Sequence, residues 1–262
     1  TYPFKGHLNA QHHVISNLYI NDPSSNNQGL FGILNGADID SLHLENGFVK
    51  GGANVGALCG SANDTTQISN VTSGLVVQGS EHIGGIVGAA QTSNVAYSTN
   101  SGSVIASIRN VGGIIGKAEN STVNNSINAG IMIAPTAVGG IVGSLEGATS
   151  AVNDALNTGM IIGQDEFMGA ISGKKVSNPT VSNCYYDKQI FTASSDGTGL
   201  FTTEITGTEL QGNLGNSSDW LFSADLSARC YNRKPSSTTT RSSSFLFEPR
   251  HCRLRNTRIS SR

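Results

Sequence analysis

The sequence predicts an all-β fold: a right-handed parallel β-helix (β-solenoid) of about six coils, with about 28 residues in each coil. Three observations predict it. A short glycine-rich block recurs at nearly constant spacing, a second pattern of asparagine and glycine recurs in phase with it, and a β-branched run follows each copy of the second pattern. Only 13% of the residues are charged and 32 are glycine, a composition that suits short strands joined by tight turns.

The glycine-rich block occurs six times with small variations. Its third copy reads IGGIVG and ends at Gly88. The closing glycines of successive blocks are 28, 28, 28, 27 and 30 residues apart, a regularity that chance does not produce. Glycine at recurring corners permits a positive φ and a close approach of the chain, which a side chain would block. The predicted structural repeat glycines are Gly32, Gly60, Gly88, Gly116, Gly143 and Gly173.

An aliphatic residue stands two positions before each closing glycine. A single coil has too few apolar side chains to bury a core, but coils stacked at roughly 4.8 Å per step share a continuous one. We therefore expect this column to point inward at one level in each coil. The predicted core column is Leu30, Leu58, Ile86, Ile114, Ile141 and Ile171.

The second pattern is clearest in segments 94–102, 122–130 and 151–159, which read NVAYSTNSG, TVNNSINAG and AVNDALNTG. They align without gaps, and the short runs of aliphatic residues after them are typical of strands. The recurring asparagines have two interpretations: their amides stack and bond along the solenoid axis, or they are ordinary turn residues. Both remain open from the sequence. These residues are Asn100, Asn128 and Asn157.

Two other repeat folds fit the pattern poorly. A β-propeller needs about 40 or more residues in each blade, and the period here is shorter. Leucine-rich repeats overlap in length, but they require a regular leucine pattern with a helical segment in each unit. The solenoid is therefore the favoured architecture.

The charge distribution and the limits of the repeat divide the chain into four parts. We expect residues 1–27 to be an N-terminal capping segment, 28–188 the solenoid, and 189–226 a closing segment. Residues 1–226 carry a net charge of −10, from 7 basic and 17 acidic residues, which disfavours binding to nucleic acid. Residues 227–262 carry 9 basic residues against one acidic residue, for +8. This tail is expected to be disordered or to come from an altered reading frame, and a basic interaction arm is its functional alternative.

Motifs for catalysis and metal binding are missing from the sequence. The four cysteines lack the paired spacing of a zinc site, and Cys59 and Cys184 fit slots of the repeat as small buried residues. A polysaccharide lyase or glycoside hydrolase on a β-helix needs stacked carboxylates, yet one period after Asp64 stands Thr92, and then Asn120. We expect a non-catalytic protein without metal or cofactor, with the lyase or hydrolase as the alternative function.

The repeat resembles the GLUG-motif family, named after a Gly-Leu-any-Gly core that here reads Gly-Ile-Val-Gly in two coils. The segment from Pro3 to Gly6 resembles the start of such arrays, and the segment from Asn183 to Asp187, followed by Gly199 and Leu200, resembles their end. The family occurs in bacterial surface and secreted proteins, including immunoglobulin A proteases and adhesin-like chains. The resemblance implies an extracellular or cell-surface spacer or binding region outside the catalytic part.

Binding to a glycan or a host surface protein is the active form of this expected role. Aromatic side chains stack on sugar rings, so they are the candidate contacts on a face rich in Ser, Thr and Asn. The Tyr185-Tyr186 pair has a second interpretation, as a plug that closes the core where the array ends. No apolar stretch reaches the roughly 20 residues of a membrane span, so we expect no membrane insertion. The candidate stacking residues are Tyr97, Tyr185, Tyr186 and Trp220.

Overall fold

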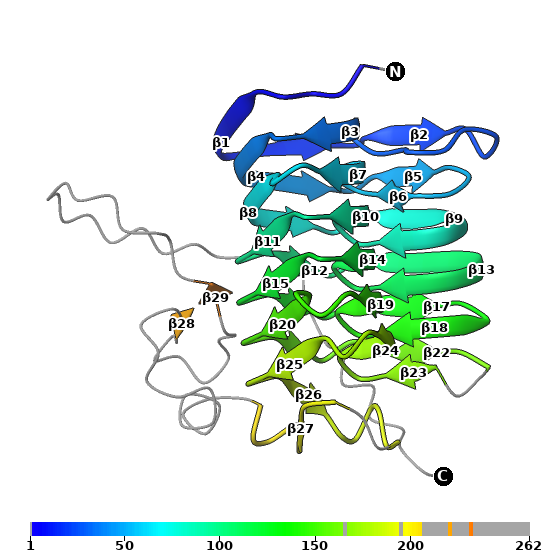
Figure 1. The fold of residues 1–262 in the computed structure, drawn as a ribbon, viewed down its shortest axis with the longest axis vertical. Helices are drawn as coiled ribbons and strands as arrows, with labels where there is room; N and C mark the ends of the chain where they lie inside the picture. Colours follow the sequence, from blue (N-terminus) through cyan, green and yellow to red (C-terminus); the bar gives the residue numbers. More distant parts are fainter. Residues whose placement is uncertain (1, 165–166, 194–195, 206–219, 222–230, 233–262) are drawn as a thin grey trace, which may run out of the picture.

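The protein is a parallel β-solenoid. A computed structural model describes residues 2–164, 167–193, 196–205, 220–221 and 231–232. Within these residues the chain forms strands and no helix, and successive coils pile up along one axis (Figure 1). Three parallel sheets run along that axis, and the chain passes from one to the next within each coil. The predicted all-β parallel solenoid of about six coils is confirmed.

The first sheet, here called sheet A, has six strands that lie one above another. It consists of β3 (Phe31–Asn35), β7 (Cys59–Asn63), β10 (Val87–Gln91), β14 (Ile115–Glu119), β19 (Val142–Glu146) and β24 (Ser172–Val176). In register, Val87 lies between Cys59 and Ile115, which are its neighbours in the coils on either side. Residues 28 apart are thus adjacent in space, as the glycine spacing predicts.

Sheets B and C complete each coil. Sheet B consists of β1 (His7–Ser16), β4 (Asp38–Glu45), β8 (Gln67–Ser73), β11 (Asn94–Ala96), β12 (Thr99–Asn100), β15 (Thr122–Asn124), β16 (Ile127–Asn128), β20 (Ala151–Asn153), β21 (Leu156–Asn157), β25 (Thr180–Ser182), β26 (Tyr185–Asp187) and β27 (Thr198–Leu200). Sheet C consists of β2 (Tyr19–Asn21), β5 (Phe48–Lys50), β6 (Val55–Gly56), β9 (Val76–Gly84), β13 (Ser103–Gly112), β17 (Ile131–Ile133), β18 (Thr136–Gly139), β22 (Ile161–Ile162) and β23 (Met168–Gly169).

One hydrophobic core runs through the stack. Five members of the predicted core column are fully buried, namely Leu58, Ile86, Ile114, Ile141 and Ile171. Leu30 differs, because it belongs to the first of these coils and is only partly buried against the core. Each buried aliphatic side chain lies over the equivalent one in the next coil, so the core has no breaks between coils.

The repeat glycines work by close approach and not by positive φ. Among the described glycines, only Gly36, Gly147 and Gly197 have a positive φ. A Cβ at the repeat glycine Gly88 would lie 2.4 Å from the backbone N of Val55 in the preceding coil, so the two chains touch there. Of the two properties that glycine permits at these corners, the structure uses the close approach of the chain and not the positive φ.

Polar residues make the left-handed bends instead. At one corner of successive coils, φ lies between 56° and 60°, and each residue follows the previous one by about one period: Asn27, Asn54, His82 and Asn110. Asparagine tolerates this conformation because its short polar side chain bonds to local groups. Here the bonds run along the axis, since the Asn54 amide donates to Oδ1 of Asn27 at 3.0 Å.

The N-terminal segment belongs to the stack. Strands β1 and β2 pair in parallel with β4 and β5, so the predicted entry or capping segment, residues 1–27, supplies a coil layer of its own. Phe4 forms the actual cover at this end: its backbone bridges to Leu34, and its ring lies 5.0 Å from the ring of Phe31. The solenoid begins before residue 28 because the backbone groups of β4 find partners in β1.

The closing segment covers the other end. Strand β27 adds to β26, and Phe191 packs its ring edge-on to Tyr186 beneath the last coil. Leu200 and Ile205 pack against Ile127 on the outside of sheet B. Of the remaining C-terminal residues, the structure describes only β28 (Trp220–Leu221) and β29 (Tyr231–Asn232), which pair antiparallel. The rest of the predicted basic tail, 227–262, lies outside the described residues.

Candidate functional site

The three recurring asparagines form a buried ladder. The Asn100 amide donates to Oδ1 of Asn128 at 2.9 Å, and the Asn128 amide donates to Oδ1 of Asn157 at 2.8 Å. All three side chains are 2% exposed or less. Each Oδ1 also accepts a local backbone N–H two residues on, as from Gly130 to Asn128 at 3.2 Å. The asparagine ladder (Asn100, Asn128 and Asn157) thus fixes a turn in each coil and bonds the coils together.

A column of glycines makes room for this ladder. A Cβ at Gly85 would lie 2.5 Å from Cγ of Asn100, and a Cβ at Gly140 would lie 2.4 Å from Cγ of Asn157. The second glycine of the block and the asparagine 15 to 17 residues later therefore face each other across the interior of the same coil. The two patterns lie apart in the sequence, and the fold brings them into contact.

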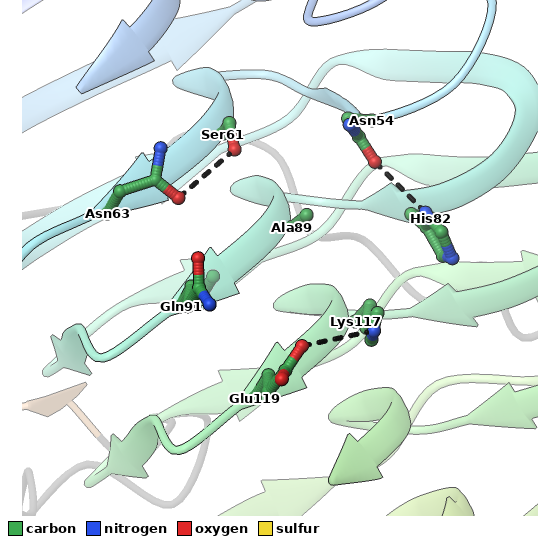
Figure 2. Close-up of a pocket in the computed structure, with 9 residues that line it drawn as sticks. Asn54, Ser61, Asn63, His82, Ala89, Gln91, Lys117 and Glu119 are labelled. Carbon is green, nitrogen blue, oxygen red and sulfur yellow. Dashed lines mark hydrogen bonds and ion pairs between the residues drawn. The ribbon is translucent and has the colours of Figure 1, made fainter. Parts of the chain in front are cut away.

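An open hollow of about 190 Å³ lies on the outer face of sheet A. Figure 2 shows Ala89 in its middle, with Asn54 and His82 on one side and the column of Asn63, Gln91 and Glu119 on the other. Ser61, Ala90 and Lys117 complete the lining. The side chains come from three successive coils, so this sheet A hollow exists only when the coils stack. For that reason no pattern in the sequence predicts it.

The charged groups around the hollow are paired with one another. Lys117 lies between two carboxylates, with Nζ 3.2 Å from Oε2 of Glu119 and 3.2 Å from Oε2 of Glu146. Burial opposes the charge on Lys117, but the hydrogen bonds that its ammonium group donates to Glu146 and Glu119 outweigh burial and raise the pKa of that group. Burial lowers the pKa of His82, so its imidazole is neutral at pH 7. The hollow is accordingly polar and does not present an unpaired cation.

The candidate aromatic residues do not form one platform. Tyr186 is only 9% exposed and its ring contacts Phe191, so it closes the core and cannot stack on a ligand. Tyr185 is half-buried against a small apolar cluster with Leu156 and Leu200. Tyr97 stands at a corner with φ of 51° and is half-buried. Trp220 lies in β28, and its side chain is outside the described part of the chain.

The described residues contain no group of three or more His, Cys, Asp or Glu side chains that could hold a metal ion. Cys59 and Cys184 are both free and buried. Nor do the described residues form a helix of sufficient length and hydrophobicity to cross a membrane. The ionisable groups that do meet form ion pairs on the surface, such as Arg109 with Glu81 at 2.8 Å.

Comparison with known proteins gives a match over a single coil. Residues 79–105 match the GLUG motif. The chain carries a GLUG motif. The resemblance to the GLUG-motif family is thereby confirmed, and the match spans the stretch from the middle of β9 to β13, which contains Gly85, Gly88 and Asn100. In this coil the GLUG motif therefore includes both the glycine that touches the preceding coil and the glycine that faces the ladder.

One solved structure supports the fold of the whole array around the GLUG motif. It is a chain from Bacteroides ovatus described as a "putative immunoglobulin A1 protease", with a TM-score of 0.64 and 20% sequence identity. The match covers 81% of this chain and 73% of that chain. A likeness at this identity shows a shared fold. No curated protein matches the sequence.

Proposed function

We propose that the chain is a non-catalytic repeat module of a bacterial cell-surface or secreted protein, serving as a spacer or as a binding surface for a glycan or a host protein. One observation carries the proposal. The asparagine ladder, the glycine columns and the core aliphatic residues all serve to hold one coil on the next. The interior side chains therefore make the stack of coils rigid, and a spacer or a flat binding face requires a rigid scaffold.

The outer faces support the binding form of this role. On sheet B, Thr122 Oγ1 donates to Oδ1 of Asn94 at 2.6 Å, and Asn153 donates to Oδ1 of Asn124 at 3.0 Å. The outer surface of this sheet therefore carries a continuous line of hydroxyl and amide groups fixed at the spacing of the coils. Fixed polar groups lose little side-chain entropy when they bind a partner.

The alternative is a polysaccharide lyase or glycoside hydrolase, and the sheet A hollow is where it would act, because Glu119, Lys117 and His82 line it. Incubation of the folded chain with acidic and neutral polysaccharides, followed by a reducing-end assay and a glycan array, separates the two functions. We expect no release of reducing ends. Release that disappears in Glu119→Gln would overturn the proposal in favour of the enzyme.

The spacer form makes a mechanical expectation of its own. Because every coil is bonded in register to its neighbours, the chain should extend under force only by unwinding coils one at a time. Single-molecule pulling should give repeated steps of about 28 residues, since that is the register offset between Val87 and Ile115. A single unfolding event over the whole chain would contradict the expectation that the coils unwind one at a time.

A further inference from the structure

The sheet A hollow comes from a change in side-chain size along one outward column. In register, Ile33, Ser61, Ala89 and Lys117 occupy the same position of successive coils. Ser61 and Ala89 are the two small side chains of these four, so the outer surface of sheet A is hollowed between the larger Ile33 and Lys117. The floor is the aliphatic surface of Ala89, since the neighbouring Ala90 is buried in the core, and the walls are polar. At about 190 Å³ the hollow is smaller than the ~300–1,000 Å³ pockets that enclose whole drug-sized ligands. It suits one ring of a chain that lies across the face.

The charges select against ionic ligands. Lys117 is neutralised by Glu119 and Glu146, and the described residues offer no third metal ligand beside His82 and Glu119. An anion would meet the carboxylates, and a cation would meet the ammonium group of Lys117. A neutral ligand with many hydroxyl groups meets no such conflict.

The walls offer fixed donors and acceptors. The Asn54 amide nitrogen donates to Oδ1 of Asn27 at 3.0 Å, so Oδ1 of Asn54 faces Nδ1 of His82, also at 3.0 Å. That oxygen can only accept, so Nδ1 of His82 carries the proton and Nε2 is an acceptor. Opposite it, the Gln91 side chain is exposed and presents both an amide donor and a carbonyl acceptor. One wall thus presents an acceptor and the other presents a donor and an acceptor, and with the aliphatic floor between them they match the hydroxyl groups and C–H face of a sugar ring.

We propose that the sheet A hollow binds one ring of a neutral glycan, seated on Ala89 between His82 and Gln91. This inference rests on the binding form of the proposed function and names its ligand class. Strands β7, β10 and β14 supply seven of the lining residues, and the corner residues Asn54 and His82 supply the other two, so the site depends on stacking of the coils.

The test is binding of a panel of neutral hexose and N-acetylhexosamine oligosaccharides to the whole chain, with sialylated and uronate oligosaccharides as the charged counterparts. Affinity is measured by calorimetry or by saturation-transfer NMR. Ala89→Ile fills the hollow with the residue that Ile33 already places at this register position, so the variant should fold. Ser103→Ile is the matched control, because it makes a similar change on the outer face of sheet C beside Ile131.

We expect a neutral oligosaccharide to bind, Ala89→Ile and Gln91→Ala to weaken binding at least about tenfold, and Ser103→Ile to leave it unchanged. Binding that Ala89→Ile does not affect would overturn the inference and leave the proposed function standing. Binding only of charged oligosaccharides, or of none, would overturn it as well. Cleavage of the oligosaccharide would instead remove the proposed function, because the reducing-end assay detects it separately.

Discussion

Gly113 faces Asn128 across the interior of one coil, and a Cβ at Gly113 would lie 2.3 Å from Cγ of that asparagine. The same position in two other coils is alanine. Register places Ser73, and not asparagine, opposite Ala57, and it places Tyr186 opposite Ala170. The second position of the block is thus glycine in the coils where a ladder asparagine fills the space opposite it. It is alanine in these two coils, which have no ladder asparagine.

Gly113→Ala should destabilise the solenoid, because the new methyl group would also lie 2.3 Å from the carbonyl oxygen of Gly140, a backbone atom that cannot move alone. We expect the free energy of unfolding to fall by about 1 to 3 kcal/mol, as in other overpacked cores. The measurement is the urea midpoint. Adding Asn128→Ser, which copies Ser73, should recover part of the loss and give a coupling of ~0.5–3 kcal/mol.

Gly74→Ala is the matched control for that substitution. Its added Cβ would meet no atom closer than 3.5 Å, and Gly74 has no positive φ. The urea midpoint should change little. If the two alanine variants lost equal stability, glycine would be required for general chain flexibility and not for space beside the ladder.

Asn128→Ala should break the asparagine ladder in its middle. It removes the acceptor of one of the two Asn100 amide N–H groups and of the Gly130 N–H, and each such buried group costs ~1–3 kcal/mol. Asn124→Ala is the comparison, because Asn124 donates to Asn94 on the half-buried outer face, where water can replace the bond. Chemical unfolding should show a loss of several kcal/mol for the first variant and about 1 kcal/mol or less for the second. Equal losses would mean that the ladder adds no stability beyond that of a surface bond.

His82 should make the stability depend on pH. Burial lowers its folded pKa below the ordinary value of 6.5, so between these two values the unfolded chain binds more protons than the folded one. The free energy of unfolding should therefore fall as the pH drops through 6.5 towards the folded pKa. Asn54 contacts the ring, and the surrounding charges are Glu81, Lys117, Arg109 and Glu146.

His82→Asn tests this pH dependence. Asn54 and Asn110 occupy the same corner position in the neighbouring coils, so asparagine fits the left-handed bend and extends the amide contacts. Urea titrations between pH 7.5 and 5.5 should give a shallower decline for the variant than for the parent chain. His43, whose pKa burial also lowers, supplies the decline that remains. Identical slopes would show that His82 titrates alike in the folded and unfolded chains.

The two buried thiols should report on opening of the stack. Burial raises the pKa of Cys59 well above its ordinary value, and burial raises that of Cys184 to about 12, so neither forms the reactive thiolate at pH 8. In a chain with Cys230→Ser and Cys252→Ser, thiol reagents should react slowly in native buffer. Cys184, near the end of the array, should react faster than Cys59 because terminal coils open more readily. Immediate labelling of Cys59 would contradict its position in the core.

Much of the fold could be predicted from the sequence, because residues one period apart in a stack of coils become neighbours in adjacent strands. The spacing of the closing glycines is reproduced as pairings such as Val87 with Ile115, and Ile86 and its equivalents form the core. The GLUG resemblance rested on the same residues. A longer or shorter coil would displace every later strand from its partner, so the period is strongly constrained and visible.

The amino-acid sequence alone predicts the order along the axis: parallel strands, about six layers, and aliphatic residues at the centre. Only the tertiary structure decided what happens across a coil. It assigned the bends to residues such as Asn54 and His82, set Gly113 against Asn128, added β1 to the stack and opened the hollow at Ala89. Contacts along the axis join residues that are about 28 positions apart in the sequence, so the period predicts them. Contacts across the interior and over the ends join residues at other sequence separations, which the period does not predict.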